Sequence, residues 1–194
     1  MATAHTGKLR DLGKETAIVS LAYLGAFFAT FEVLMPMQNS LFPGFDSRAS
    51  LLFLPHGVRV LAAWLLGGRS VPALLPGVVF VFFYLVGCSA FSPSRLAAIA
   101  GAVTVPAACF FVLRLLGHDL RPSPERRACW LCIMGIGLVI SLVTSLVTNY
   151  AFDSAPQDYI AYLIGDMFGL FFLMLVLMLI FRALRQSNLS TPSS

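Results

Sequence analysis

The sequence predicts an all-α protein, a polytopic transmembrane helical bundle of about six helices. Apolar residues make up 58% of the chain and charged residues only 11%, whereas the charged share of a soluble domain is about a quarter. The mean hydropathy is +0.85. The apolar residues fall in long runs, and a bilayer core of ~30 Å needs roughly 20 of them per helix. We therefore expect most of the surface to contact the lipid bilayer.

Six apolar runs carry this prediction, and turn-forming residues separate them. The run at 51–67 is the shortest and contains Pro55, His56 and Arg59. We therefore expect it to be either a tilted span or a re-entrant helix. The six runs lie at about 16–36, 51–67, 70–88, 95–116, 128–150 and 159–181.

The basic residues predict the orientation. Of thirteen Lys and Arg residues, ten fall in one set of connections and two, Arg48 and Arg95, in the opposite set. Because cytoplasmic loops carry an excess of Lys and Arg, we expect a multi-pass protein of a bacterial inner membrane with both termini in the cytoplasm. The expected parts are a cytoplasmic segment at 1–15, the six-helix domain at 16–185 and a disordered cytoplasmic tail at 186–194. The ten residues are Lys8, Arg10, Lys14, Arg69, Arg114, Arg121, Arg126, Arg127, Arg182 and Arg185.

The sequence argues against two function classes. The net charge of +4 would suit nucleic-acid binding, but the basic residues are scattered through short loops rather than clustered. The chain contains no nucleophile elbow, P-loop or His-Glu-x-x-His motif. We therefore expect no nucleic-acid partner, no enzyme activity and no cofactor.

The four cysteines are Cys88, Cys109, Cys129 and Cys132, and all lie within or at the ends of apolar runs. Cys129-Trp-Leu-Cys132 has the spacing of a redox or metal-binding pair. A metal site would need two further ligands, which no second pair or nearby histidine supplies. We expect all four to be small apolar helix residues and expect no metal site.

Four ionisable residues lie inside the expected spans: Glu32, His56, Arg59 and Asp166. A charge near the bilayer centre costs several kcal/mol unless it is paired, so such residues usually face the bundle interior and mark function. At a rise of about 1.5 Å per residue, all four lie within about 6–12 Å of the outer boundary. We expect Arg59 to pair with Asp166, Glu32 or both, at the floor of a cavity open to the outside.

This layer predicts a site for a small polar or anionic ligand. Two alternatives remain open: a buried ion pair that only fixes helix register, and a proton or ion path. The expected ligand-binding residues are Arg59, Asp166, Glu32 and His56, with Asn149, Tyr159 and Tyr162 at the rim.

Two further patterns concern helix packing. Gly165-x-x-x-Gly169 has the small-residue spacing that permits close contact between helices. The run at 128–150 also carries a polar stripe, which we expect to bond to a neighbouring helix or to the helix's own carbonyls. The stripe consists of Ser141, Thr144, Ser145 and Thr148.

The segments Phe53-Leu-Pro55-His-Gly57-Val-Arg59, Gly67-Gly-Arg69-Ser-Val-Pro72 and Gly165-Asp166-Met-Phe-Gly169 carry a family resemblance. They resemble the first class of bacterial membrane-associated sensor domains, the MASE family. The resemblance implies an inner-membrane sensory module of the kind usually fused to a cytoplasmic kinase or cyclase. This chain departs from the pattern in its shorter length, in Val71 where an aromatic residue often stands, and in ending soon after its last helix. A separate cytoplasmic signalling protein is therefore the expected partner.

Three functions follow from these observations. The first is a sensory or ligand-binding membrane module that signals through a separate partner. The second is the substrate-binding component of a small-solute transporter of the vitamin-uptake type, because six helices in a chain of this size suit such subunits. The third is a membrane scaffold or assembly factor whose buried ion pair is architectural.

Overall fold

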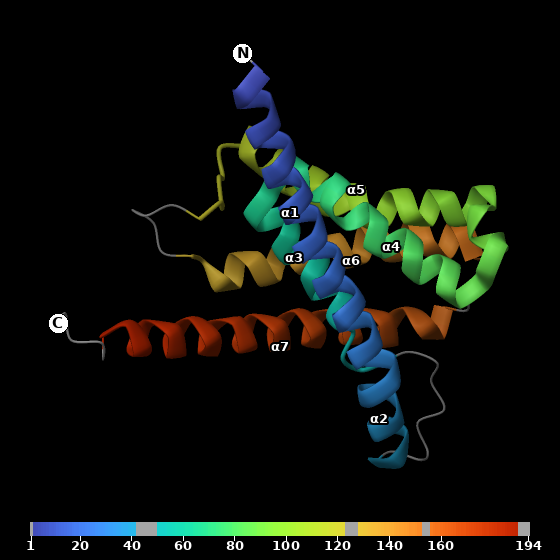
Figure 1. The fold of residues 1–194 in the computed structure, drawn as a ribbon. Coiled ribbons are helices and arrows are strands. Elements are labelled where there is room, and N and C mark those ends of the chain that lie inside the picture. Colours follow the sequence, from blue (N-terminus) through green and yellow to red (C-terminus); the bar gives the residue numbers. More distant parts are fainter. Residues whose placement is uncertain (1, 42–49, 123–127, 153–155, 190–194) are drawn as a thin grey trace.

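The computed structural model describes residues 2–41, 50–122, 128–152 and 156–189. Within these ranges the side chains at 2–9, 148–152, 156–159, 161, 184–185 and 187–189 are not described. The described chain is all helical and contains no strand, which confirms the predicted fold class. Figure 1 shows α4, α5, α6 and α7 packed in sequence, with α1 crossing them obliquely.

The first helical segment is continuous and has three parts. They are α1 (Ala2–Phe28), a π-helical turn η1 (Ala29–Leu34) and α2 (Met35–Leu41). The second segment consists of α3 (Leu54–Leu66), the turn η2 (Gly67–Arg69), α4 (Ser70–Val86) and the turn η3 (Gly87–Phe91). The remaining helices are α5 (Pro93–Leu115), α6 (Trp130–Phe152) and α7 (Pro156–Leu189).

Five segments of the described chain are long and apolar enough to cross a membrane, against the six that the sequence suggested. The difference lies in the run at 51–67, which forms the 13-residue helix α3. At a rise of about 1.5 Å per residue, such a helix is shorter than a bilayer core is thick. It counts as a span only together with α4, from which the η2 turn separates it. The five segments are Arg10–Leu41, Leu54–Phe91, Pro93–Leu115, Trp130–Val147 and Tyr162–Ala183.

Contacts between connections agree with the grouping that the charges predicted. Arg69, in the η2 turn, forms an ion pair with Glu15 of α1, with 2.9 Å between Nη1 and Oε1. The indole of Trp64, near the end of α3, donates a hydrogen bond to the carbonyl of Leu120 in the α5–α6 connection. The first part of α1, the η2 turn and the α5–α6 connection therefore lie at the same end of the bundle.

Helix α3 is the centre of the molecule. Its residues from Leu54 to Trp64 are all buried, and it contacts α1, α4, α5, α6 and α7. A helix that is apolar around most of its circumference is stable only when other elements surround it. One side of α3, which includes Val58, packs with α1, α4 and α5. The other side, which includes Val60, packs with α5, α6 and α7.

The beginning of α3 is fixed by backbone hydrogen bonds to two other helices. The amide of Phe53 donates to the carbonyl of Gly165 in α7, at 2.8 Å. The amide of Leu54 donates to the hydroxyl of Thr30, at 3.3 Å, and that hydroxyl donates to the Ala26 carbonyl of α1. These bonds satisfy donors that a helix start leaves open, which a buried helix end requires.

The glycines of Gly165-x-x-x-Gly169 serve a different contact from the one expected. They face the non-helical segment that leads into α3 rather than a second small-residue helix stripe. A Cβ atom at Gly165 would overlap the carbonyl oxygen of Ser50, and one at Gly169 would overlap that of Phe53. The absence of side chains therefore lets the α3 backbone reach α7 closely enough for the bond between Phe53 and Gly165.

The helix α7 extends to Leu189, four residues into the tail for which the sequence suggested disorder. Residues 190–194 lie outside the described residues.

We expect Gly169→Ala to lower the unfolding temperature in detergent, because its methyl group must displace a backbone carbonyl. Overpacking of this kind typically costs about 1–3 kcal/mol. Gly25→Ala in α1 is the matched control, since a Cβ atom there meets nothing within 4 Å. Equal unfolding temperatures for the two variants would contradict the backbone contact.

Candidate functional site

Polar side chains from α3, α6 and α7 meet at His56. His56 is fully buried, and its two ring nitrogens face different helices. Nδ1 lies 3.3 Å from Oδ2 of Asp166 in α7, within ion-pair range but without hydrogen-bond alignment. Nε2 lies 3.2 Å from the carbonyl oxygen of Gly137 in α6. His56 therefore links α3 to both α6 and α7.

Asp166 has a second partner. The hydroxyl of Ser141 in α6 donates a hydrogen bond to the same carboxylate oxygen, Oδ2, at 2.5 Å. Ser141 is fully buried and Asp166 is 6% exposed. A buried carboxylate needs both charge compensation and hydrogen-bond donors. Ser141 supplies a donor, and His56 supplies charge compensation when its imidazole is protonated.

The partners of His56 determine where its proton lies. A backbone carbonyl only accepts hydrogen bonds, so Nε2 carries a proton in this arrangement. Nδ1 faces a carboxylate, which accepts when ionised and donates when protonated. The pair therefore holds either an imidazolium beside a carboxylate or a neutral imidazole beside a carboxylic acid, and the two states differ by the position of one proton.

Gly137 makes room for this contact. A Cβ atom there would overlap the side chain of Leu170 and would lie 3.9 Å from Nε2 of His56. The glycine lets α6 approach α3 and α7 at the depth of the polar cluster.

Arg59 lies one turn after His56 and is only 8% exposed. Its Nε is buried without a hydrogen-bond partner, and it takes part in none of the ion pairs among the described residues. Its guanidinium carbon lies 6.0 Å from the ring centroid of Phe53, the N-cap residue of α3. The side chain therefore points back toward the start of its own helix, as helical side chains do.

The expected pairing of Arg59 with Asp166 or Glu32 is thus wrong, since His56 takes the place beside Asp166. Arg59 nevertheless belongs to the same region. Both Arg59 and Asp166 act electrostatically on His56 and on the buried hydroxyl of Tyr23 in α1. The structure brings together three of the four ionisable residues that depth had grouped.

Glu32 is the exception, because its side chain is exposed rather than turned into the bundle. It stands in the π-helical turn η1, two residues after Thr30, which is fully buried. Residues two apart on a helix do not share a face. The bond that Thr30 makes to the start of α3 therefore turns Glu32 outward.

The expected rim is only partly described. Tyr162 lies one turn before Asp166 on α7, and its side chain is 47% exposed. The side chains of Asn149 and Tyr159 lie outside the described part of the structure.

The polar stripe on α6 forms both kinds of hydrogen bond that we expected, to a neighbouring helix and to carbonyls of its own helix. Ser141 bonds to a neighbouring helix, and Thr144 donates to the carbonyls of Ile140 and Ser141 in its own helix. Ser141 is a site residue that the depth argument missed, although the stripe contained it. The sequence analysis also missed Tyr23 and Gly137, because nothing in the sequence distinguishes them from other residues of apolar helices.

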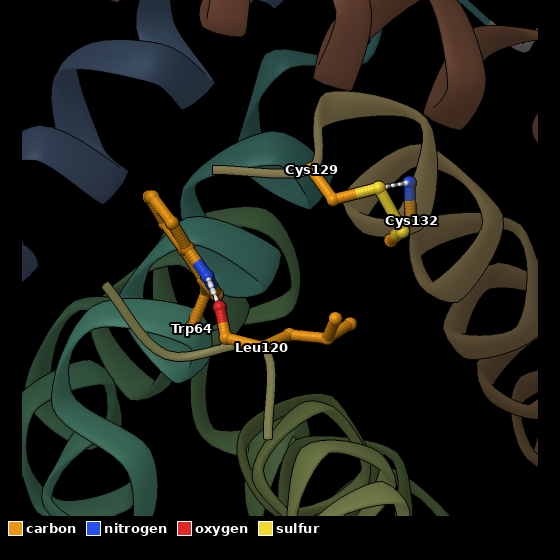
Figure 2. The surroundings of a disulfide bond; sticks show 4 residues. All are labelled: Trp64, Leu120, Cys129 and Cys132. Carbon is orange, nitrogen blue, oxygen red and sulfur yellow. Dashed lines mark hydrogen bonds between the residues drawn. A yellow bond between two sulfur atoms is a disulfide. The ribbon is translucent and has the colours of Figure 1, made fainter. Parts of the chain in front are cut away.

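The cysteine pair also differs from the expectation. Cys129 and Cys132 form a disulfide rather than standing as separate apolar residues, and Figure 2 shows it at the start of α6. Spacing of two intervening residues at a helix start brings the two sulfur atoms together. Cys88 and Cys109 are free.

Comparison with known protein families, characterised proteins and solved structures gave no significant match.

A double-mutant cycle measures the buried pair. His56→Ala leaves the Asp166 carboxylate uncompensated and should cost about 3–5 kcal/mol of unfolding free energy. Asp166→Ala should also destabilise, because it removes the acceptor of the Ser141 hydroxyl and the ion-pair partner of His56. The double variant should be less destabilised than the sum of the two single variants, with a coupling energy of about 1–3 kcal/mol.

His118→Ala is the control for the loss of an imidazole, since His118 is exposed in the α5–α6 connection. Strict additivity of His56→Ala and Asp166→Ala would show that the two side chains do not interact.

Proposed function

We propose that this protein is a ligand-binding module of the sensory kind in a bacterial inner membrane, and that it takes a small anionic ligand at Arg59. The observation that carries the proposal is a buried arginine, whose Nε has no hydrogen-bond partner and which forms no ion pair among the described residues. Burying an uncompensated charge costs several kcal/mol. A folded protein retains such a group where a partner from outside supplies the missing charge.

The charge balance around Arg59 favours an anion. The nearby Asp166 is already engaged by His56 and Ser141. The start of α3 contributes the positive end of a helix dipole, and Arg59 points back toward it. Arginine presents several donors in a planar fork that suits carboxylate and phosphate groups. We therefore assign the ligand to the class of small carboxylates or phosphates.

The family resemblance supports a sensory role. The segment from Phe53 to Arg59 and the segment from Gly165 to Gly169 carry that resemblance, and they pack directly against each other. His56, Arg59 and Asp166 of the polar cluster belong to these two segments. The basic connections at one end of the bundle favour a cytoplasmic position for that end, where a separate signalling protein would read the bound state.

Replacing Arg59 by Met tests the proposal, since Met keeps an unbranched chain and removes the charge. We expect Arg59→Met to raise the unfolding temperature of the ligand-free protein, because it relieves an uncompensated buried charge. The same change should abolish the stabilisation of the wild-type protein by its ligand, about 2.7 kcal/mol at a hundredfold excess over the dissociation constant. The probes are inorganic phosphate and a set of mono-, di- and tricarboxylates, so that the two classes are distinguished.

Arg69→Met is the matched control. Arg69 is largely exposed and pairs with Glu15 at the surface, so its loss should change stability by less than about 1 kcal/mol. A strong destabilisation by Arg59→Met, with no probe acting on the wild type, would leave an architectural cluster and hence the scaffold function. Native mass spectrometry of the purified protein then shows whether an anion co-purifies with wild type and is missing from Arg59→Met.

A further inference from the structure

The second chemically distinctive place in the molecule lies at the opposite end of α3 from the Arg59 cluster. Cys129 directly precedes α6, and Cys132 lies in its first turn. Both side chains are exposed, as is Leu131 between them. Other parts of the described protein therefore do not cover the disulfide.

Cys129 is the N-cap residue of α6. Its carbonyl accepts the first backbone hydrogen bond of the helix, from the amide of Ile133 at 3.1 Å. Its sulfur accepts a hydrogen bond from the amide of Cys132, at 3.3 Å, as the side chain of an N-cap residue does. An amide donor and a helix start both favour negative charge on sulfur. Of the two sulfur atoms, that of Cys129 is the better placed to carry a thiolate.

The cysteine pair also lies at the end of the bundle that is expected to face the cytoplasm. The α5–α6 connection shares its end of the bundle with the first part of α1 and the η2 turn, which is the end that the basic residues assign to the cytoplasm. Thiols are kept reduced there, and a cytosolic disulfide is usually transient, catalytic or redox-sensing. A pair whose positions allow a disulfide, in a compartment that keeps thiols reduced, is suited to alternate between the two states.

We propose that Cys129 and Cys132 form a thiol–disulfide exchange site whose substrates are thiols of the glutathione class, and that Cys129 is the attacking sulfur. This inference is independent of the anion site. In the oxidising direction, the Cys129 thiolate attacks a sulfur of a disulfide substrate, forms a mixed disulfide and releases one substrate thiolate, which takes up a proton. The Cys132 thiol then loses its proton and attacks Cys129, releasing the second substrate thiol. Two electrons pass from the protein to the substrate disulfide, and the reverse sequence reduces the protein.

The surroundings supply an intrinsic reporter. The chain has two tryptophans, and both lie here. Trp130 stands between the two cysteines, and its ring centroid is 6.3 Å from that of Trp64 in α3. Figure 2 shows Trp64 in the surroundings of the disulfide, with its indole bonded to the carbonyl of Leu120. Because Trp130 lies between the two cysteines and its ring lies close to that of Trp64, tryptophan fluorescence should change when the disulfide opens.

The test uses the full chain with Cys88→Ser and Cys109→Ser, which leaves the exchange pair alone. We expect tryptophan fluorescence to follow a reversible two-electron transition across mixtures of reduced and oxidised glutathione. The unfolding temperature, measured in parallel, distinguishes this transition from loss of fold. A disulfide that stays closed in excess reduced glutathione, with the fold intact, would overturn the proposal and identify a structural cross-link.

The single variants assign the attacking sulfur. Treated with oxidised glutathione, Cys132→Ser should accumulate one glutathione adduct at Cys129, at least tenfold faster than Cys129→Ser accumulates one at Cys132. Intact-protein mass spectrometry counts the adducts. Equal rates in the two variants would overturn the assignment of Cys129. A mixed-disulfide rate no faster than that of Cys88 in a variant that retains only Cys88 would overturn the exchange site itself.

Discussion

The burial of α3 on every side is the constraint on which the rest of the structure depends. A 13-residue helix cannot span a bilayer alone, and eleven of its residues are buried, so it is held by the helices around it. Its backbone is tied at the start to α7 through Phe53 and to the π-helical turn η1 through Leu54. Inside a membrane, an unsatisfied backbone donor costs several kcal/mol. Both the glycines of α7 and the π-helical turn of α1 serve to meet this requirement.

The position of α3 also creates the electrostatic problem that the polar cluster answers. His56 and Arg59 stand one turn apart on a helix with no exposed face, so both are carried into the interior. One carboxylate, that of Asp166, lies beside His56 and accepts from Ser141. In either protonation state of the pair, His56 and Asp166 together carry no net charge, so the pair does not compensate Arg59. Moreover, the positive end of the α3 helix dipole lies on the side toward which Arg59 points. The cluster therefore carries an excess of positive character at Arg59, and this imbalance is a stronger pointer to an anionic partner than the presence of charged residues alone.

The sequence predicted the fold class because the fold class follows from composition. It also grouped the ionisable residues by depth, from the rise per residue. It did not predict which partners meet, because depth leaves the direction of each side chain around its helix open. His56 and Arg59 share a face approximately, and only packing decides that His56 reaches Asp166. Glu32 faces outward because Thr30 is drawn inward by Leu54, a contact between residues far apart in the chain. The disulfide at Cys129 was missed for a similar reason, since an apolar run hides the fact that a helix begins at Trp130.

Helix α3 lies between the proposed anion site and the proposed exchange site. Arg59 lies toward its beginning and Trp64 five residues later, a separation of about 7.5 Å along the axis. Trp64 contacts Trp130, within the cysteine pair, and bonds to the α5–α6 connection. A short helix enclosed by tightly packed neighbours moves as a unit rather than bending, because interiors are close-packed. Any shift of α3 that accompanies anion binding would therefore also displace Trp64. Anion binding would then change the equilibrium between the open and closed disulfide by some factor. By thermodynamic linkage, opening of the disulfide would change the anion affinity by that same factor.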